Sequence, residues 1–567
     1  MENQRLFLWL ALGFVCFLLY QAWVTDYQRP APAEPPAVAE TPAPDDLPSI
    51  DDLPQAPGAE SPDADLPALP EEPAADEETE GGEAMAREAP EVRVVTDVLD
   101  VSISLAGGDL VEAKLPKYPV HKDQPNQPVT LLTENPAEYF VFRSGWRASG
   151  GGPEPTHLAR YQSGRTAYRL AEGDDQLVVP LVWQEGGVTV HKTYTLRRGQ
   201  YRIGLEYRIE NAGGEPWGGA NYVQIVRRNL HPERSMFDVD TYSFLGPVVY
   251  DGEKYEKLDG NDLAEEPVSL TATGGWIASI QHHFLAAAVP PPDKPFQYSA
   301  NLREGLVVLT SIGPLQTVPA GATQSFAEEF FVGPKLQRQL AATAPELELT
   351  VDYGFLTLIA QPLFWVLSKV HGVVRNWGWA IIIVTILIKL LFYKLTKTSG
   401  LSMARMRELQ PRMKSLQERY KDDRQALSRA MMELYKREKV NPVAGCLPML
   451  VQIPFFLAFY WVLLESVEMR QAPFMLWIDD LSARDPFFIL PLMMGVAMFF
   501  QQKISAAPPG DPVQAKVMQF LPVVFCVFMA FFPAGLVLYW LTNTLLSFAQ
   551  QWHINRQVHA AKKVAGG

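Results

Sequence analysis

Cysteine is scarce in this chain of 567 residues, which contains only Cys16, Cys446 and Cys526. Each lies in an apolar run, so no disulfide framework supports the long polar middle. Paired spacings such as CxxC are missing, which excludes a zinc site built on cysteine. Basic residues are also in deficit, because 49 Lys and Arg against 64 Asp and Glu give a net charge of −15. A DNA-binding or RNA-binding surface is therefore not expected.

The first apolar run predicts that the chain is anchored in a membrane. Residues 6–24 hold 19 residues without a charge and follow Arg5, which is long enough to span a bilayer and longer than most secretory signals. We expect residues 1–24 to form an uncleaved transmembrane anchor with its N-terminus in the cytoplasm. Residues 25–90 are rich in proline and acidic residues, a composition that buries too little apolar area to fold, so they are expected to form a disordered linker.

The polar middle, residues 91–345, has a strand-like pattern. Residues 188–196 and 201–209 alternate with a period of two around the turn at residues 197–200, which predicts a β-hairpin. Glycine-rich turns recur and no helical period persists, so we expect a large all-β sandwich. His282 and His283 are adjacent on an expected strand, where neighbouring side chains point to opposite faces, so they should not share a metal ion.

Motifs that carry catalysis are missing from this middle segment. It has no GxSxG, HExxH or Walker phosphate loop. We expect no enzymatic activity, no metal and no cofactor. Sandwiches of this size often bind sugars, which leaves open an envelope protein that binds or modifies carbohydrate.

Beyond residue 345 the chain becomes apolar. Residues 346–375 include an aromatic stretch interrupted by Pro362, which favours an amphipathic helix along the membrane surface. Five spans are expected after it, at residues 377–395, 443–464, 486–502, 517–532 and 535–551. We assign the second span to residues 376–396, the third to sixth spans to residues 441–556, and a short basic tail to residues 557–567. The spans at 486–502 and 517–532 are short, about 25 Å against a hydrocarbon core of about 30 Å.

Charge determines the predicted topology. Residues 394–440 hold 13 Lys and Arg against six Asp and Glu, which places this segment in the cytoplasm by the positive-inside rule. We therefore expect a polytopic α-helical membrane protein with six transmembrane helices and both termini in the cytoplasm. It would be a multi-pass protein with the sandwich on the outer side of the membrane.

A cytoplasmic helical hairpin is expected at residues 397–440. Met406, Leu409, Met413, Leu416 and Tyr420 follow a coiled-coil seam, and the pair Asp422-Asp423 caps the second helix. Two interpretations fit Met406, Met413, Met431 and Met432. They fill the hairpin core, or their adaptable thioethers make transient contacts with varied apolar helices.

Lys389 is the most informative residue because it lies inside the second span, about 18 Å from its start. Two interpretations are open. Its amine reaches the membrane surface beside Lys394, or it lies in a wet cavity with polar groups from other spans. The candidate groove residues are Lys389, Thr385, Gln452, Tyr539, Trp540, Thr542 and Asn543.

Several runs resemble the YidC-type membrane protein insertases of bacteria with two membranes. The most specific are residues 438–448 (EKVNPVAGCLP), 470–474 (RQAPF) and 532–540 (FPAGLVLYW). Similar runs in the polar middle are residues 254–257 (KYEK), 274–276 (GGW) and 349–354 (LTVDYG). The resemblance covers nearly the whole chain.

The resemblance implies a groove in the inner leaflet, closed outward, that holds one buried cation. This cation is usually arginine in the family, and Lys389 occupies the matching position. The family often has two adjacent tyrosines in the last span, where this chain has Tyr539 and Trp540. The resemblance also implies a multi-pass protein of the bacterial inner membrane, with a sandwich of the galactose mutarotase type in the periplasm.

Insertion and assisted folding of newly made inner-membrane proteins is the function that the resemblance implies. The implied partners are nascent membrane proteins, the Sec translocon with its accessory subunits, the lipid bilayer and, transiently, ribosomes or signal-recognition targeting factors. Only eleven residues follow Arg556, which is short for a ribosome-binding tail. A small-solute transporter is the other alternative, although such proteins more often show internal repeats.

Overall fold

The computed structural model describes residues 90–230, 243–421, 423–438, 447–505 and 512–565. The expected anchor (residues 1–24) and nearly all of the expected linker lie outside these ranges. The chain divides into two compact units. The sandwich unit comprises the described parts of residues 41–361 and 460–472, and the helical unit those of residues 362–459 and 473–567.

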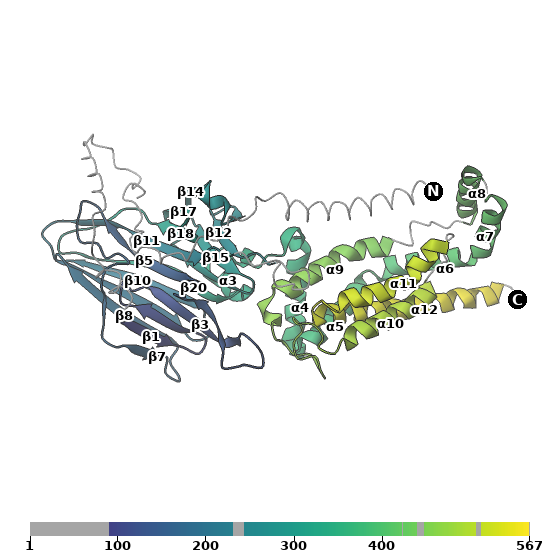
Figure 1. The fold of residues 1–567 in the computed structure, drawn as a ribbon, viewed down its shortest axis with the longest axis horizontal. Coiled ribbons are helices and arrows are strands. Elements are labelled where there is room, and N and C mark those ends of the chain that lie inside the picture. Colours follow the sequence, from purple (N-terminus) through teal and green to yellow (C-terminus); the bar gives the residue numbers. More distant parts are fainter. Residues whose placement is uncertain (1–89, 231–242, 422, 439–446, 506–511, 566–567) are drawn as a thin grey trace. The chain divides into compact units, whose positions relative to one another are not determined.

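Two β-sheets form the core of the sandwich unit (Figure 1). Among the described residues, the first sheet has 11 strands, with the order β14 (Val268–Thr273), β17 (Pro295–Arg303), β18 (Leu306–Ile312), β11 (Trp217–Arg228), β5 (Phe140–Ala148), β3 (Leu110–Pro119), β2 (Asp100–Ser104), β1 (Glu91–Val95) and β7 (Ala167–Arg169), while β19 (Gln316–Val318) pairs with β11 and β4 (Pro128–Leu132) with β3. The second has nine strands, with the order β13 (Tyr255–Lys257), β12 (Gly246–Tyr250), β15 (Trp276–Gln281), β16 (Phe284–Val289), β20 (Thr323–Pro334), β10 (Arg202–Asn211), β9 (Val188–Arg197), β8 (Gln176–Glu185) and β6 (Gln162–Ser163). The predicted β-sandwich is confirmed for this unit, although the segment also contains the short helix α3 (Gln337–Thr343) and is therefore not all-β.

The hairpin predicted from alternation is present as β9 and β10. The two strands are antiparallel, with Leu196 opposite Ile203. Alternate residues of β9 are buried, as expected for a strand with one face on a core. Gly199 in the turn has φ +71°, a conformation that glycine adopts without a steric penalty.

The prediction that His282 and His283 lie on a strand, with side chains on opposite faces, is wrong. They form the two-residue turn between β15 and β16 and do not lie on a strand. Alternation no longer applies in a tight turn, and the two rings stack with their centroids 3.7 Å apart. Among the residues that the structure describes, no group of three or more His, Cys, Asp and Glu side chains could hold a metal ion.

A lysine occupies an inward position of β9 in the sandwich core. Lys192 is fully buried, and its Nζ donates to the carbonyls of Gly107 (2.7 Å) and Ser144 (3.1 Å) and lies 3.7 Å from Oδ1 of Asp109. Burial raises the pKa of Asp109 to about 6 and lowers the pKa of Lys192 to about 8. The charge is thus buried with a partner, as a core requires.

The segment 460–472 is held to the sandwich unit by a second buried ion pair. Oε2 of Glu465 lies 3.8 Å from Nζ of Lys335, and Oε1 accepts a hydrogen bond of 2.7 Å from Ser243. Nε2 of His282 lies 2.9 Å from the carbonyl oxygen of Leu464. Breaking a buried ion pair from one side leaves an uncompensated charge, so each partner depends on the other.

The helical unit consists, in its described residues, mainly of helices (Figure 1). They are α4 (Thr357–Val374, from residue 362), α5 (Trp377–Leu391), α6 (Tyr393–Glu408), α7 (Gln410–Arg419), α8 (Arg424–Arg437), α9 (Leu447–Glu465, to residue 459), α10 (Ile489–Ser505), α11 (Pro512–Met529) and α12 (Ala534–Ala565). Helix α12 packs against α5, α6 and α10, and α10 packs against α11. The last helix therefore organises the unit.

Four of the five spans predicted after residue 376 coincide with one helix each, as far as the described residues show. The first, predicted at residues 377–395, is wrong at its end, because α5 stops at Leu391 and α6 begins at Tyr393 in a different direction. Helix α12 continues well past the predicted end at residue 551, because no Gly or Pro interrupts it before Gly566. Among the described helices, α4 alone is long and apolar enough to cross a membrane, and Trp377–Leu391 with Tyr393–Met406 passes the same test as a pair bent by 65°. The count of six spans, their orientation and the surface position of residues 346–375 therefore stay predictions.

The predicted hairpin is present, with a break in its first arm. Pro411 lies in the first turn of α7, and the ring of proline cannot continue a preceding helix, so α6 ends before it. The predicted cap is confirmed for Asp423, which accepts hydrogen bonds of 3.0 Å from the backbone NH groups of Gln425 and Ala426, while Asp422 lies outside the described residues. Met406, Met413 and Met431 are half-buried, whereas Met432 is 60% exposed.

We predict that Glu328→Gln flattens the pH dependence of sandwich stability. Glu328 is buried with Asn221 as its hydrogen-bond donor, and burial raises its pKa from 4.5 to about 8. Between these values the folded state keeps a proton that the unfolded state has released, so the free energy of unfolding falls as pH rises, by up to about 1.4 kcal/mol per pH unit.

Thermal unfolding of the full chain at pH 6 and pH 8, followed by tryptophan fluorescence, measures this effect. The variant should lose less stability than the wild type over that interval. Glu329→Gln is the matched control, since Glu329 is partly exposed beside Arg202. Equal losses in wild type and Glu328→Gln would contradict the prediction.

Candidate functional site

The N-terminal end of α5 is anchored to the segment that follows α9. Asn376 caps α5 by accepting a hydrogen bond from the backbone NH of Trp379 (3.1 Å), and its Nδ2 donates to the carbonyl of Phe474 (2.9 Å). The Phe474 ring packs against Trp379 and directly over Gly378. This close approach fixes the helix that carries Thr385 and Lys389.

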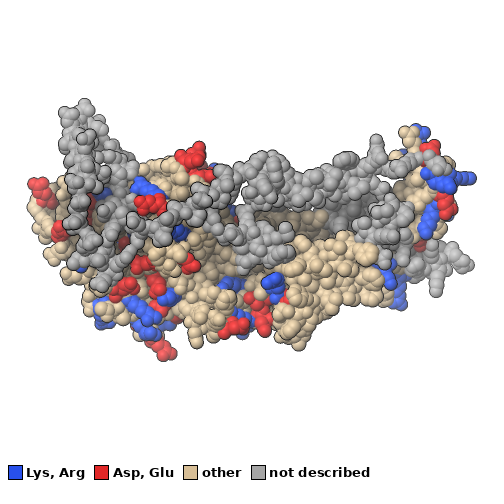
Figure 2. All heavy atoms as spheres, in the orientation of Figure 1, with Lys and Arg blue, Asp and Glu red and all other residues tan. Residues whose placement is uncertain are grey.

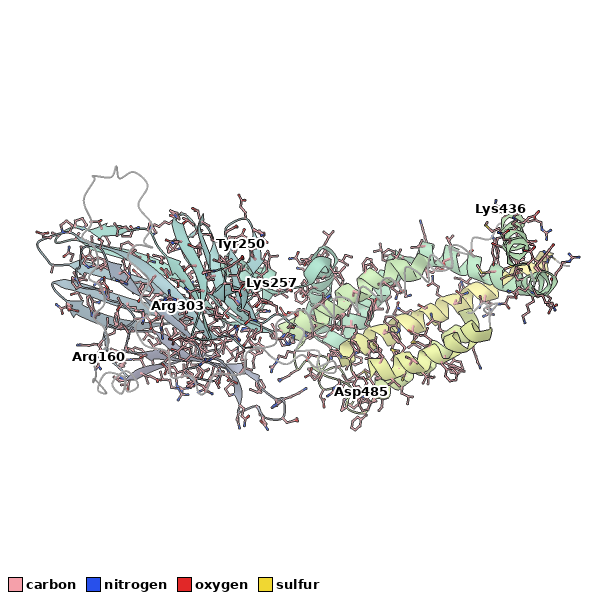
Figure 3. The ribbon with its side chains drawn as sticks, turned by 45° about the horizontal axis from the view of Figure 1, so that its top comes forward. Arg160, Tyr250, Lys257, Arg303, Lys436 and Asp485 are labelled. Carbon is pink, nitrogen blue, oxygen red and sulfur yellow. The ribbon has the colours of Figure 1, made fainter. Side chains whose placement is uncertain are left out.

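A buried aspartate orders the start of α10 in the same unit. Asp485 accepts hydrogen bonds from the backbone NH groups of Phe487 (3.0 Å) and Leu490 (2.6 Å) and from the indole of Trp477 (3.1 Å). Its position at the end of the bundle can be followed in Figure 3. Carboxylates that accept several NH groups at a helix start are strongly stabilised.

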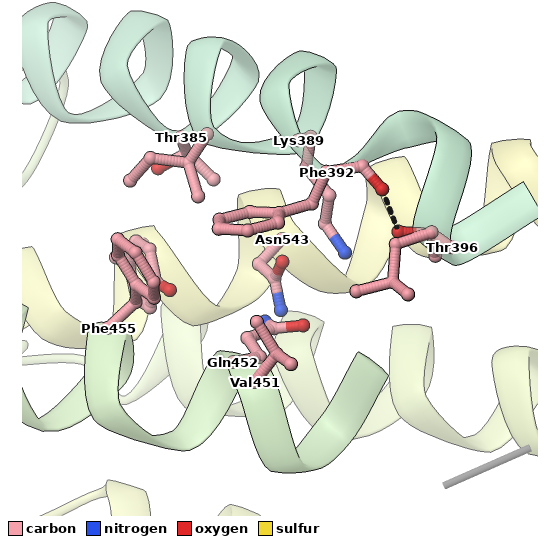
Figure 4. A pocket seen from close by; sticks show the side chains of 11 residues that line it. Thr385, Lys389, Phe392, Thr396, Val451, Gln452, Phe455 and Asn543 are labelled. Carbon is pink, nitrogen blue, oxygen red and sulfur yellow. Dashed lines mark hydrogen bonds between the residues drawn. The ribbon is translucent and has the colours of Figure 1, made fainter. Parts of the chain in front are cut away.

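A cavity lies between α5, the start of α6, α9 and α12 (Figure 4). It is lined by Thr385, Ile388, Lys389, Phe392, Leu395, Thr396, Val451, Gln452, Phe455, Tyr539 and Asn543. Of these residues, Lys389 alone is charged. The cavity has a volume of about 30 Å³, which is enough to hold water.

The amine of Lys389 points into this cavity toward Asn543 and Gln452 (Figure 4). Its Nζ donates a hydrogen bond of 2.7 Å to Oγ of Ser547 on α12. Within the described part of the chain, no Asp or Glu oxygen lies within 4.0 Å of this nitrogen. Among these residues, the positive charge is therefore held by a neutral group and has no counter-charge.

Five of the seven predicted groove residues line the cavity: Lys389, Thr385, Gln452, Tyr539 and Asn543. The ring of Tyr539 stacks on Phe459, with centroids 4.5 Å apart. The hydroxyl of Thr385 donates to the carbonyl of Ile381 within α5 (2.7 Å) and so does not serve the lysine.

Trp540 and Thr542 do not line the cavity. Successive helical residues point about 100° apart, so neither shares the face of Tyr539 and Asn543. Trp540 instead packs between Phe456 (centroids 4.6 Å apart) and Phe525 (4.7 Å). It belongs to the aromatic packing between α9, α11 and α12.

Sequence reasoning missed Ser547 and the aromatic wall made by Phe392 and Phe455, whose centroids are 5.2 Å apart. A signal for Ser547 was present, because Tyr539, Asn543 and Ser547 are four residues apart and so lie on one face of α12. No sequence signal distinguishes Phe392 or Phe455 from other apolar residues of the spans.

Charged side chains are unevenly distributed over the surface. On the face that Figure 2 shows, Lys, Arg, Asp and Glu gather over the sheets and over the hairpin, while the helical bundle presents mostly uncharged atoms. Its exposed side chains include Leu492, Phe500, Phe520, Val524 and Phe528. Exposed apolar area of this extent is typical of a surface that contacts lipid or protein.

Comparison with known proteins matches both units. Residues 91–366 match the family described as YidC periplasmic domain, and residues 369–562 match the family described as 60Kd inner membrane protein. The chain is 49% identical over 579 residues to "Membrane protein insertase YidC" of Thioalkalivibrio sulfidiphilus, covering 99% of this chain and 100% of that protein.

Two further proteins are similar over most of their length. The protein of the same name from Nitrosococcus oceani is 47% identical, with 98% of this chain and 99% of that protein covered. Among solved structures, "Active YidC insertase crystal structure with the first transmembrane domain resolved" is 20% identical and has a TM-score of 0.37, covering 82% of this chain and 92% of that one.

We predict that Gly378→Ala lowers the stability of the helical unit. A Cβ at this position would overlap the ring of Phe474, and overpacking of this kind costs typically about 1–3 kcal/mol. Thermal unfolding of the purified protein should show a lower midpoint. Gly372→Ala on α4 is the control, because nothing lies within 4 Å of its added Cβ. An unchanged midpoint for Gly378→Ala would contradict the close packing.

Proposed function

The chain belongs to the YidC family of membrane protein insertases, and we propose that it inserts its substrates through the cavity around Lys389. The family acts in the inner membrane and carries a periplasmic domain, which corresponds here to the sandwich unit. We also propose that the residues lining this cavity contact the substrate, that the cavity is hydrated, and that it opens to the inner side of the membrane.

One observation carries the proposal. Lys389 directs an unneutralised amine into a cavity whose other polar groups, on α5, α6, α9 and α12, are uncharged. A charge within a membrane segment is costly unless water or polar groups surround it. Lys394 shows that Lys389 lies close to the end of its helix, from where a lysine amine can reach the membrane surface. The amine instead points into the cavity, and this supports a role for its charge there.

The energy for insertion has to come from the substrate, because no nucleotide-binding loop occurs in the sequence. Twenty Leu-like residues gain roughly 6–12 kcal/mol on entering the membrane, whereas each charged residue carried to the bilayer centre costs about 2.5–3.5 kcal/mol. A substrate with a few charges outside its span is therefore close to balance. A polar cavity that hydrates these charges lowers the barrier, and a positive one favours acidic segments.

The cavity is too small for a polypeptide in the arrangement described. With a volume of about 30 Å³, it can admit a chain only if α5, α9 and α12 move apart. Helix α10 has 17 residues, or about 26 Å, which is shorter than a hydrocarbon core of about 30 Å. A thinned bilayer beside this helix would shorten the polar segment's path.

The topology and the partners predicted from the sequence are part of this proposal. Six spans would place the basic hairpin, which includes Lys436 (Figure 3), and the C-terminal tail in the cytoplasm. The hairpin would meet ribosomes or targeting factors there, and the Sec translocon would be a partner within the membrane. Met432, exposed on α8, is the methionine best placed for transient contact with an apolar helix.

We predict that Lys389→Met slows the insertion of small substrates with acidic translocated segments several-fold, and that Lys389→Glu slows it more, because repulsion replaces attraction. Lys389→Arg should be tolerated, since it keeps the charge. The measurement is the insertion rate in cells depleted of the wild-type protein.

Lys394→Met is the matched control for these variants. It also removes one amine, but Lys394 does not line the cavity, so insertion should stay near the wild-type rate. Normal insertion of acidic substrates by both Lys389→Met and Lys389→Glu would overturn the proposal.

A further inference from the structure

Ser547 is the one hydrogen-bonding partner of the Lys389 amine among the described residues. Nζ of Lys389 donates to Oγ of Ser547 (2.7 Å), and the same Oγ donates to the carbonyl of Asn543 one turn earlier on α12 (2.7 Å). Because the only hydroxyl proton of Ser547 is used by that carbonyl, its oxygen is left to accept. The geometry thus matches a donor such as an ammonium group.

The neutrality of this partner has a physical consequence. A carboxylate at position 547 would form an ion pair with the lysine and cancel its charge, whereas a hydroxyl holds the amine in place and leaves the charge intact. An ammonium has three donors, and the serine uses one of them. Two donors remain for water or for a passing carboxylate.

Without a partner, the lysine has an alternative position. Its side chain is long and flexible, and Lys394, five residues further on, is only about 7.5 Å along the helix. An amine so close to a helix end can extend to the membrane surface. A fixed acceptor inside the bundle opposes this movement.

We propose that Ser547 is a positioning residue that retains the Lys389 amine in the cavity and thereby sets the preference for acidic substrate segments. Residues 539, 543 and 547 share one face of α12, so the helix presents the acceptor directly beside the cavity-lining Asn543. A substrate carboxylate then competes with a neutral hydroxyl for the amine. This inference rests on the proposed function of the cavity.

The test compares Ser547→Ala with Ser547→Thr, which keeps the hydroxyl. Two versions of one small substrate, with either two Asp or two Asn in the translocated segment, are inserted by full-length protein. Ser547→Ala should lower the ratio of acidic to neutral insertion several-fold, and Ser547→Thr should keep the wild-type ratio. Thr398→Ala is the control, because Thr398 makes the same kind of bond within its helix, to Lys394 (3.0 Å), and does not line the cavity.

A second measurement follows the amine itself. A water-soluble acylating ester should label Lys389 several-fold more in Ser547→Ala than in wild type or Ser547→Thr, with Lys394 as the internal reference in mass spectrometry. Higher labelling together with a lower acidic-to-neutral ratio supports the inference. Unchanged labelling, an unchanged ratio, or an equal loss of both substrates overturns it.

These readouts separate the inference from the proposed function. If Lys389→Met leaves insertion normal, the function proposed for the cavity fails, whatever Ser547→Ala does to labelling. If Lys389→Met lowers the acidic-to-neutral ratio and Ser547→Ala does not, only the role of Ser547 fails.

Discussion

The ammonium group of Lys389 needs polar surroundings inside an otherwise apolar bundle, and the arrangement of the cavity follows from that need. Ser547 accepts a hydrogen bond from this ammonium group. Asn543 lines the cavity, and its backbone carbonyl accepts the hydrogen bond that orients the hydroxyl of Ser547. Gln452 adds a polar group from α9. Since each of these groups is costly in hydrocarbon, their convergence from several helices makes physical sense only around a shared polar space.

Buried cations among the described residues have two kinds of partner. In the sandwich unit, Lys192 lies beside Asp109 and Lys335 beside Glu465, whereas the guanidinium of Arg227 donates only to neutral groups of Ser279, Ile280 and Gln281. The ion pairs contribute little net stability but are costly to break, which suits a structural role. Among the described residues Lys389, like Arg227, has only a neutral acceptor, but its amine points into a cavity. The cavity beside this unpaired amine is the strongest physical reason to propose that the lysine handles substrate.

Periodicity predicted regular structure well and failed where the chain turns or packs. The β9–β10 hairpin and the Asp423 cap follow from local patterns and are present. The turn at His282 was missed because two polar residues between apolar strands look the same in a turn and in a continuous strand. Polar residues within apolar spans identified five residues of the cavity. Ser547 escaped because a serine is unremarkable until its partner is known, and the wall at Phe455 depends on tertiary contacts.

The most direct test of the cavity as a substrate path is photocrosslinking to a ribosome-bound nascent membrane protein. A photoreactive residue at position 388 lies in the cavity wall, while one at the adjacent position 387 lies on the exposed apolar face of the same helix. Passage through the cavity predicts that the acidic segment of the substrate crosslinks strongly from Ile388 and weakly from Leu387. Crosslinks from Leu387 alone, or equal crosslinks from both, would contradict the account.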